Sequence, residues 1–472
     1  MNAQVTPQAT SPNYDLAKSR LRTFHDAREA FVTGADTPRA YLERCLAAIE
    51  LHEPTVKAWV TLNPDAALAS ADASTERYRT GQALSPIDGM PVGIKDVIQT
   101  KDMPTTLGSP IFAGRNTGMD SASVNALRLA GASIVGKTVT TEFAFMVPGP
   151  TTNPYDANRT PGGSSSGSAA AVGAGMVPVA LGNQVVGSVI RPAAYCANYA
   201  IKPTLGALHG GEGLSLSQLH LGVHAASLQD MWSVAYEIAH RAGADPGYPG
   251  LYGPANSAPA AQPTRLIALE TEGWEMCDEV TRKGFAALLE QLQAKGTQVI
   301  TRHDNPAVER FEMATRDSVV LCRILCSYEM RWALRNYQDT GLLSKELGVW
   351  LAMAENLTLD DYRQALHTRE DIRTAWRALQ PHADAMLTLS SPGPAPALDF
   401  LAEAGEPAYA FKTGSPSFNA ATSLLGSPAI TVPMMSIDGM PQGIQLIGHE
   451  HQDWPLCGFG AWFENALERV SL

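Results

Sequence analysis

Short apolar runs bounded by glycine, proline and other turn residues alternate with helical periodicity along the first half of the chain. The β-branched run WVTLN at 59–63 and the apolar run within DGMPVGIKDVIQ at 88–99 each indicate a strand. The stretch SASVNALRLAGASIVGKT at 121–138 has the pattern of a helix, a glycine turn and a strand. This alternation predicts a layered α/β fold.

A second pair of strands is indicated near the end of the chain. The runs LGSPAITVPMM at 425–435 and GIQLIGH at 443–449 are apolar, and Asp438 and Gly439 form a turn signal between them. Strands in both halves of the chain favour one shared sheet. Residues 270–380 instead carry long charged amphipathic runs, which predict helices.

The composition is that of a large globular protein. Of its 472 residues, 45% are hydrophobic and 17% are charged, so the chain can bury an extended core as one α/β domain or as two. The Pro/Gly/Ala-rich stretch at 243–263 is a candidate linker or surface crossing. The formal net charge is −12, from 35 basic and 47 acidic residues, without a dense Lys/Arg run. This charge argues against a nucleic-acid or anionic-membrane surface and favours a small-molecule partner.

Targeting and redox signals are weak. The N-terminal sequence MNAQVTPQATSPNYD is polar, and no apolar run reaches the roughly 18–20 residues of a membrane span. We therefore expect a cytoplasmic protein. The six cysteines are scattered, which is typical of buried thiols. Cys322 and Cys326 could share one helix face, but no ligand follows at metal-site spacing, so we expect no metal.

The run PGGSSSGSAAAVGAG at 161–175 is compatible with three kinds of chemistry. A phosphate-binding loop needs Lys and then Ser or Thr after the second glycine, where this chain has Ser168 and Ala169. A nucleophile elbow fits residues 163–167, but an elbow follows a buried strand, and the preceding NPYDANRTPGG is a loop sequence. A helix N-cap employs one of the serines and leaves the other hydroxyls of the run unexplained.

The motifs around this loop resemble those of the amidase signature family of Ser-Ser-Lys hydrolases. The resemblance covers roughly residues 40–230 and 385–450, in the family's order. It rests on the following runs: GMPVGIKD (89–96), MPTTLGSP (103–110), EFAF (142–145), NPYD (153–156), GGSSSGSAAAV, GSVIRPAAYC (187–196), KPT (202–204), GSPAITVP and GMPQGIQLIG.

The resemblance implies an α/β/α sandwich with a large mixed, mostly parallel, twisted central sheet covered by helices. It implies a single amidase domain over residues 1–472, with its core at about 80–230 and 385–450. Residues of about 265–382 would form a helical cover. No cofactor is implied.

Transferred position by position, the resemblance also implies a catalytic set. Ser188 would be the nucleophile, Ser164, held by a cis peptide bond, the proton relay, and Lys95 the base, with Ser165 in support. The backbone N–H groups that hold the oxyanion would come from the turn that leads to the nucleophile: Val185, Val186, Gly187 and Ser188.

Amide cleavage explains why such a set is needed. A hydroxyl must lose its proton as it attacks, and the leaving nitrogen must gain one. Lysine can serve both steps only when neutral, so its ordinary pKa of about 10.4 must fall through burial among neutral partners. A serine hydroxyl both donates and accepts, which suits a relay between Lys95 and Ser188.

The chain departs from the family near the nucleophile. Where the pattern is Gly-Thr-Asp/Gln-Thr-Gly-Gly-Ser, this chain has GNQVVGS, in which Asn183 and Val185 replace threonines and Val186 replaces a glycine. Val186 fits the turn only if the backbone there has a negative φ. The wall near the nucleophile becomes more apolar, which predicts either a shifted specificity or a reduced activity.

Substrate-binding residues are less clearly indicated. Met146 is a candidate pocket residue, and Arg191 would either hold a substrate carboxylate or clamp the main chain. His220 and His224 lie in an apolar segment, where histidines are more typical of the core than of catalysis.

The leading hypothesis is a hydrolase that cleaves a small linear amide, or a related urea or carbamate, through a Ser188 acyl-enzyme. Two alternatives stay open: the glutaminase subunit of an amidotransferase, and a non-catalytic relative that binds a ligand. The partner would be a small amide, and a homodimer is compatible with the sequence.

Overall fold

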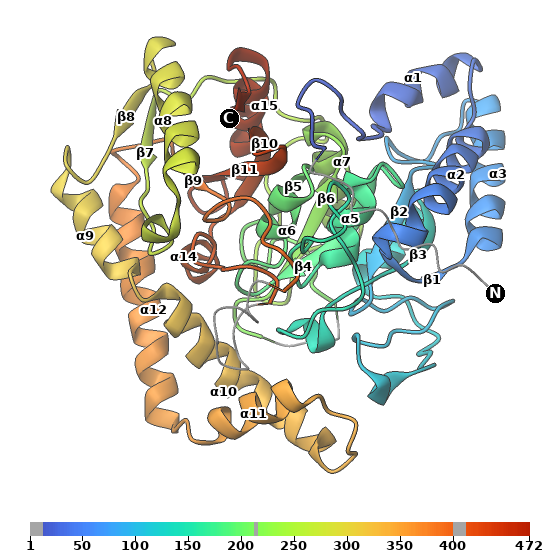
Figure 1. The fold of residues 1–472 in the computed structure, drawn as a ribbon. Helices are drawn as coiled ribbons and strands as arrows, with labels where there is room; N and C mark the ends of the chain where they lie inside the picture. The colour runs from blue at the N-terminus through green and yellow to red at the C-terminus, as the bar shows by residue number, and fades with distance from the viewer. Residues whose placement is uncertain (1–12, 212–215, 400–411) are drawn as a thin grey trace, which may run out of the picture.

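The computed structural model describes residues 13–211, 216–399 and 412–472, and one twisted sheet runs through these ranges (Figure 1). The strand order is β1-β3-β2-β4-β6-β5-β10-β11-β9-β7-β8, with β12 paired to β10. The strands within the described ranges are β1 (Trp59–Leu62), β2 (Pro91–Lys95), β3 (Ser133–Thr138), β4 (Val179–Gln184), β5 (Tyr199–Lys202), β6 (His220–Ala225), β7 (Arg265–Ala268), β8 (Gln298–Ile300), β9 (Ala385–Leu389), β10 (Ala429–Ile437), β11 (Met440–Ile447) and β12 (Val470–Ser471).

The strands predicted from the sequence are found. β1 and β2 lie in the two runs expected in the first half of the chain, and β10 and β11 form the expected hairpin. At its tip Asp438 and Gly439 have φ of 49° and 69°, the left-handed conformations that a tight two-residue hairpin turn requires. One sheet therefore unites both halves of the chain, as expected.

The sheet is mixed, but parallel pairs do not predominate. Among the described strands, five pairings are parallel (β2 with β3 and β4, β7 with β8 and β9, β10 with β12) and six are antiparallel. The expectation of a mostly parallel sheet is wrong in this respect. One physical reason is the short connection between β10 and β11, since a two-residue turn joins only antiparallel strands.

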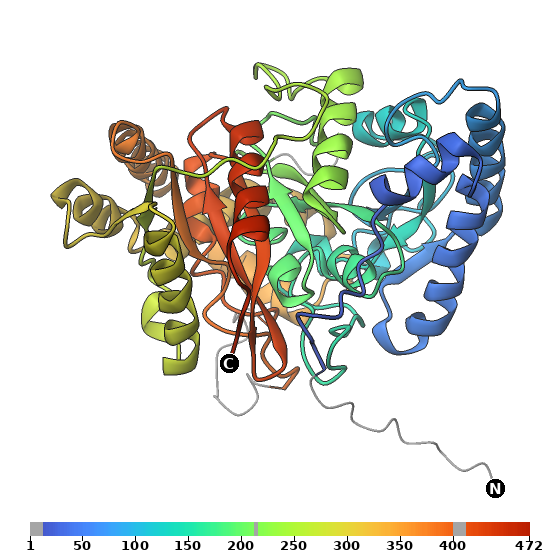
Figure 2. The ribbon, with the colours of Figure 1, turned by 90° about the horizontal axis from the view of Figure 1, so that it is seen from above.

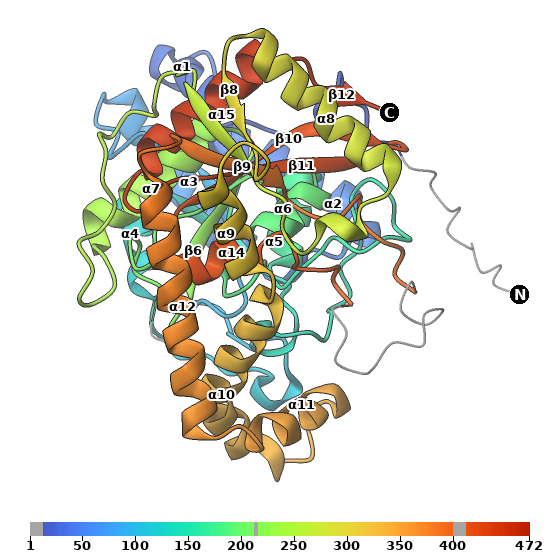
Figure 3. The same ribbon diagram turned by 90° about the vertical axis from the view of Figure 1, so that its left-hand side faces the viewer.

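Helices cover the sheet and complete an α/β/α arrangement (Figure 3). Two pairs illustrate the layers: α7 and α15 pack on each other and on strands β5, β6 and β10, while α5 and α6 pack on each other and on the central strands. The α-helices within the described residues are α1 (His25–Thr33), α2 (Pro38–Val56), α3 (Pro64–Arg79), α4 (Ala122–Leu129), α5 (Ser166–Gly173), α6 (Ile190–Tyr195), α7 (Leu228–Ala242), α8 (Glu279–Ala294), α9 (Pro306–Thr315), α10 (Ser318–Gln338), α11 (Lys345–Glu355), α12 (Leu359–Leu379), α14 (Ala420–Leu425) and α15 (Asp453–Ala466).

The segment expected as a helical cover, 265–382, does more than cover the sheet. It supplies strands β7 and β8 at one end of the sheet as well as helices α8 to α12. Figure 2 shows this end, in yellow, opposite the blue N-terminal helices. The long helices α10 and α12, together with α11, extend away from the sheet (Figure 1).

Helix α5 is the buried centre of the fold near the serine run. Its sequence SGSAAAVG consists of small residues, and all eight are buried. A Cβ added at Gly167 would lie 2.3 Å from both the carbonyl oxygen of Ala58 and the backbone nitrogen of Val139. The glycine therefore lets two backbone segments approach closely.

Helix length and composition also bear on membranes. None of the helices in the described ranges combines the length and the apolar character that a membrane crossing needs.

Candidate active site

Lys95 is the last residue of β2, and its side chain is fully buried. Strand β4 runs parallel beside β2, with Ile94 opposite Leu181, so the carboxyl ends of the two strands lie together. Lys95 Nζ lies 2.7 Å from Ser164 Oγ and contacts Asn183 at the end of β4, through both the side-chain Oδ1 and the backbone oxygen, the latter at 3.5 Å. The structure thus joins Lys95 and Ser164, which are 69 positions apart.

Burial lowers the pKa of Lys95 well below its ordinary value. Its hydrogen-bond partners are a hydroxyl and an amide group, with no carboxylate among the described residues. Lys137, another buried lysine in the same sheet, differs because its Nζ lies 3.4 Å from Asp96 Oδ1. Lys137 keeps an anionic partner that favours its charged form, whereas Lys95 has none.

The serine run divides its hydroxyls between several partners. The Gly163–Ser164 peptide bond is cis, as the family resemblance implies. Ser165 Oγ donates to the Asn183 carbonyl at 3.3 Å, and Ser168 Oγ donates to the Leu181 carbonyl at 2.8 Å. The hydroxyls of Ser165 and Ser168 therefore bind β4, whereas that of Ser164 faces Lys95.

The helix-cap interpretation of the run is wrong. Ser165 occupies the N-cap position of α5, but its side chain makes no capping hydrogen bond. Its hydroxyl is directed to the β4 backbone instead, because the buried helix starts directly against that strand.

Ser188 lies in the turn between β4 and α6, and it lines a cavity of about 70 Å³ together with Ser164 and Asn183. It is partly exposed toward that cavity. Its carbonyl oxygen accepts a hydrogen bond from the backbone N–H of Ser165 at 3.3 Å, which ties the turn to the serine run. The three residues of the expected catalytic set thus meet at one site.

The turn before Ser188 is held by side chains from β4 and α14. Gln184 Oε1 accepts from the backbone N–H groups of Val189 and Ile190 at 2.8 and 3.0 Å, and Ser423 Oγ donates to the Val186 carbonyl at 2.7 Å. Within the described ranges, the N–H groups from 185 to 188 make no intramolecular hydrogen bond. No described residue thus occupies these donors.

Val186 fits this turn without backbone strain. It is absent from the described non-glycine residues with positive φ, so the left-handed conformation that would exclude a β-branched side chain is not required. Gly187 is needed for space: a Cβ there would lie 2.6 Å from Arg191 Nη1 and 2.7 Å from Asn419 Oδ1.

Arg191 acts as a main-chain clamp. Its Nη2 donates to the Gly163 carbonyl at 2.8 Å and to Thr413 Oγ1 at 3.1 Å, and its Nε donates to the Thr413 carbonyl at 3.1 Å. Burial lowers its pKa to about 10. Among the described residues, its Nη1 has no partner, and the side chain lines the cavity, as does Met146. The clamp holds the residue that precedes Ser164.

The two histidines lie in the core, as expected. His220 and His224 are on β6, and neither lines the cavity of Ser188. Burial lowers the pKa of His224 to about 3, so it stays neutral at physiological pH.

Two residues of the site are not identified as site residues from the sequence. Asn183 stands out in the sequence only as a departure from the family pattern, yet it contacts Lys95 directly. Gln218 lies outside the motifs, although its Nε2 donates to the Val185 carbonyl at 3.0 Å. The sequence signal for Asn183 is its place at the end of an apolar strand beside the lysine strand; no comparable signal marks Gln218.

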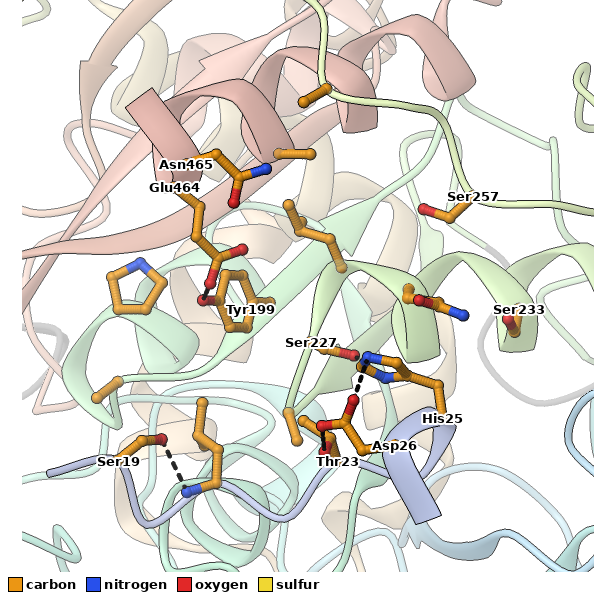
Figure 4. A pocket seen from close by; sticks show the side chains of 18 of the residues that line it. Ser19, Thr23, His25, Asp26, Tyr199, Ser227, Ser233, Ser257, Glu464 and Asn465 are labelled. Atoms are coloured by element: carbon orange, nitrogen blue, oxygen red, sulfur yellow. Dashed lines mark hydrogen bonds and ion pairs between the residues drawn. The ribbon is translucent and has the colours of Figure 1, made fainter. Parts of the chain in front are cut away.

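A larger cavity of about 860 Å³ lies between the N-terminal segment, β5, α7 and the end of α15 (Figure 4). There Ser227 Oγ lies 3.2 Å from His25 Nδ1, but the same Oγ accepts from the Asp230 N–H at 3.0 Å as the N-cap of α7. None of the three expected catalytic residues lines this cavity. It is separate from the candidate active site.

Metal ligands are not grouped in the structure. Within the described ranges, no three His, Cys, Asp or Glu side chains are arranged to hold a metal ion.

Comparisons with known proteins agree with the geometry. The family model described as Amidase matches residues 40–457. The A subunit of glutamyl-tRNA(Gln) amidotransferase from Chloroflexus aggregans is 31% identical, over 95% of this chain and 96% of that protein. A crystal structure titled as that of an amidase superposes with a TM-score of 0.80 at 28% identity, covering 94% of this chain and 100% of its own.

A further solved structure is that of the peptide amidase PAM with its competitive inhibitor chymostatin. It has a TM-score of 0.75 and 26% identity, over 94% of this chain and 97% of its own. Because the family model covers most of the chain, and Lys95 contacts Ser164, which lines one cavity together with Ser188, the chain belongs to the amidase signature family of enzymes that act on C–N bonds.

Proposed function

We propose that the protein hydrolyses a small linear amide through an acyl-enzyme on Ser188. Neutral Lys95 accepts a proton from Ser164 while Ser164 accepts the proton of Ser188, whose Oγ forms a bond to the carbonyl carbon. The tetrahedral intermediate then collapses, the C–N bond breaks, and the proton returns from Lys95 through Ser164 to the leaving nitrogen. A water molecule, deprotonated by the same relay, releases the acid and restores the Ser188 hydroxyl.

One observation carries this proposal: Lys95 lies 2.7 Å from Ser164, buried and without a carboxylate partner in the described residues, beside the cavity that Ser188 lines. A lysine in such surroundings is kept neutral by desolvation and can take up a proton. The free N–H groups of the turn at 185–188 support an oxyanion hole, which contributes strongly because the donors are already in place.

A second candidate is the glutaminase component of an amidotransferase. The names of the curated relatives support this second candidate more directly than they support the first. The proteins from Chloroflexus aggregans and Chloroflexus aurantiacus, each 31% identical to this chain, are both A subunits of glutamyl-tRNA(Gln) amidotransferase. Such a chain would act with partner subunits.

The cavity favours the first candidate. Free glutamine carries an α-ammonium group, which needs a carboxylate or several oxygens when it leaves water. No Asp or Glu is present among the described residues that line the cavity. We therefore propose an amidase that acts without partner subunits, organised as a single domain whose sheet draws strands from both halves of the chain.

A substrate screen tests the proposal. Purified protein is incubated with primary amides, anilides, ureas and glutamine, and ammonia or amine release is compared with that of Ser188→Ala. Cleavage of simple amides by the protein alone, absent in Ser188→Ala, is expected. Cleavage of glutamine alone, and only with the other amidotransferase subunits present, would reverse the order of the two candidates.

A fluorophosphonate probe tests the nucleophile independently of the substrate. It is expected to label Ser188, as mapped by peptide mass spectrometry. A label on Ser165 would instead support a nucleophile elbow, and no label on any serine would support a ligand-binding relative without activity.

A further inference from the structure

The described walls of the Ser188 cavity are predominantly apolar and come from several separate parts of the chain. The turn contributes Val185 and Val186, the segment after β3 contributes residues 143–146, and α10 and α11 contribute the facing side. From these helices the lining side chains are Val319, Cys322, Arg323, Cys326 and Trp350. The helical arm that extends from the sheet thus faces the nucleophile.

This wall is held in place by contacts outside the catalytic set. Gln218 Nε2 donates to the Val185 carbonyl at 3.0 Å and contacts the sulfur of Cys322 at 3.4 Å, so it links the turn to α10. The rings of Phe145 and Trp350 meet edge to face with centroids 4.2 Å apart. The cavity is therefore formed before any substrate enters.

The charges around the cavity restrict what it can hold. Of the described lining residues, the charged ones are Arg191 and Arg323. Three hydrogen bonds from Arg191 go to Gly163 and Thr413, which leaves Nη1 unpaired among the described residues. Because the described lining residues include no carboxylate, a cationic substrate group would lose its hydration there with no compensating partner, whereas the unpaired Nη1 of Arg191 does not exclude an anionic group.

The size of the cavity sets a second limit. Its volume is about 70 Å³, and a water-sized group needs roughly 10–15 Å³ by such a measure, so it holds roughly five to seven non-hydrogen atoms. A branched alkyl group or a phenyl ring has this size.

We propose that this cavity is an acyl-binding site that selects amides with a short, apolar acyl group that carries no cationic group, such as a branched alkanoyl or an aroyl group. The inference rests on the proposed amidase function and names its substrate class. Val186, where the family pattern has glycine, lines this cavity close to Ser188, and its side chain takes up space that a glycine would leave open.

Acyl specificity is measured with 4-nitroanilides, which keep the leaving group constant. The acyl groups are propanoyl, 2-methylpropanoyl, 3-methylbutanoyl, benzoyl, octanoyl and γ-glutamyl. We expect kcat/KM to rise about fourfold for each buried methylene up to the size of the cavity and to fall for octanoyl. The γ-glutamyl substrate, whose acyl group carries an ammonium, is expected to react at least about 100-fold more slowly than benzoyl. Equal or faster cleavage of the γ-glutamyl substrate overturns the inference, and so does a rate independent of the acyl group.

Two neighbouring valines on α10 provide a matched pair of variants. Val319 lines the cavity, whereas Val320 is 51% exposed on the outer side of the same helix. Val319→Thr places a hydroxyl in the wall at nearly constant volume and is expected to lower kcat/KM for 3-methylbutanoyl about three- to tenfold. Val320→Thr is expected to change it less than about twofold. An equal effect of both variants contradicts the proposed wall. Val186→Gly is expected to move the optimum to longer acyl groups.

Binding without turnover separates this inference from the proposed function. In Ser188→Ala, calorimetry compares benzamide and glutamine as ligands. Tighter binding of benzamide supports the acyl site even if the native protein cleaves no amide, in which case only the proposed function fails. Tighter binding of glutamine overturns the acyl site even if amides are cleaved.

Discussion

Asn183 presents both of its oxygen atoms to the Nζ of Lys95, while Ser164 Oγ lies 2.7 Å from the same nitrogen. Amide oxygens can only accept hydrogen bonds. A neutral amine has two N–H groups and one lone pair, so when both N–H groups point to Asn183 the lone pair faces the Ser164 hydroxyl. In the proposed mechanism Asn183 thus orients Lys95 as the base, in a position where the family pattern has threonine.

Substitutions of Asn183 should move the pH profile in opposite directions. In Asn183→Asp a carboxylate beside Lys95 favours the ammonium form and raises the pKa of Lys95. We expect activity at pH 7 to fall by about 100-fold and to recover partly at alkaline pH. In Asn183→Ala an oxygen that stabilises the ammonium is lost, so the acidic limb should move to lower pH while kcat falls about tenfold. The limb is read from kcat/KM between about pH 5 and 10; identical limbs in both variants would disprove the orienting role.

Lys95→Ala should lower kcat by about 10²- to 10⁴-fold, the range of general acid-base catalysis. Burial lowers the pKa of Lys95, and the base works only when uncharged. Wild-type activity should therefore rise as pH increases through that pKa and be lost below it. The acidic limb should disappear from the residual activity of Lys95→Ala, measured with the same substrate. Full activity in this variant, with circular dichroism unchanged, would remove Lys95 from the mechanism.

Gly187→Ala should damage the turn that carries the oxyanion donors. The added Cβ would lie 2.6 Å from Arg191 Nη1 and 2.7 Å from Asn419 Oδ1, so the turn or its neighbours must move. Loss of one oxyanion donor costs about 10²- to 10³-fold in kcat, and we expect a loss of that order. Steady-state kinetics with a 4-nitroanilide substrate checks it. A change confined to KM would indicate that the turn does not hold the oxyanion.

Two glycine substitutions should change stability in opposite directions. Gly167→Ala places a Cβ 2.3 Å from two backbone atoms and should lower the free energy of unfolding by about 1–3 kcal/mol or more. Gly348, on α11, has no neighbouring atom within 4 Å of the place that an added Cβ would take, and Gly348→Ala should raise the free energy of unfolding by up to about 1 kcal/mol through helix propensity. Urea unfolding followed by circular dichroism measures both. A neutral Gly167→Ala would mean that α5 can shift away from Ala58 and Val139.

The sequence predicts those parts of the fold that depend on local signals. The turn residues Asp438 and Gly439 suffice for the β10–β11 hairpin, because their positive φ angles are a local requirement of such a turn. The relative direction of strands distant in sequence has no local signal, and the expected excess of parallel pairs is wrong. Strands β7 and β8 are not predicted, because their short runs lie in a segment whose pattern is mainly helical.

The candidate site likewise contains residues that the sequence predicts and a residue that it does not. Lys95, Ser164 and Ser188 can be found because each lies in a run that resembles the family, and the structure brings them together beside one cavity. The contact of Asn183 with Lys95 depends on β2 and β4 being neighbours, which a separation of 88 positions does not reveal. The prediction that a serine of the run caps the helix is wrong, because the Ser165 hydroxyl donates to the Asn183 carbonyl on the buried strand β4 instead.

The helical arm of α10 and α11 faces the nucleophile but supplies none of the groups that move protons. In the proposed mechanism, this part of the cavity wall is therefore separate along the polypeptide from the groups that move protons. Exchanges confined to the arm would then retarget the enzyme to a new amide while the proton-transfer groups stay unchanged, which gives evolution, or an engineer, a wall that varies independently of the chemistry.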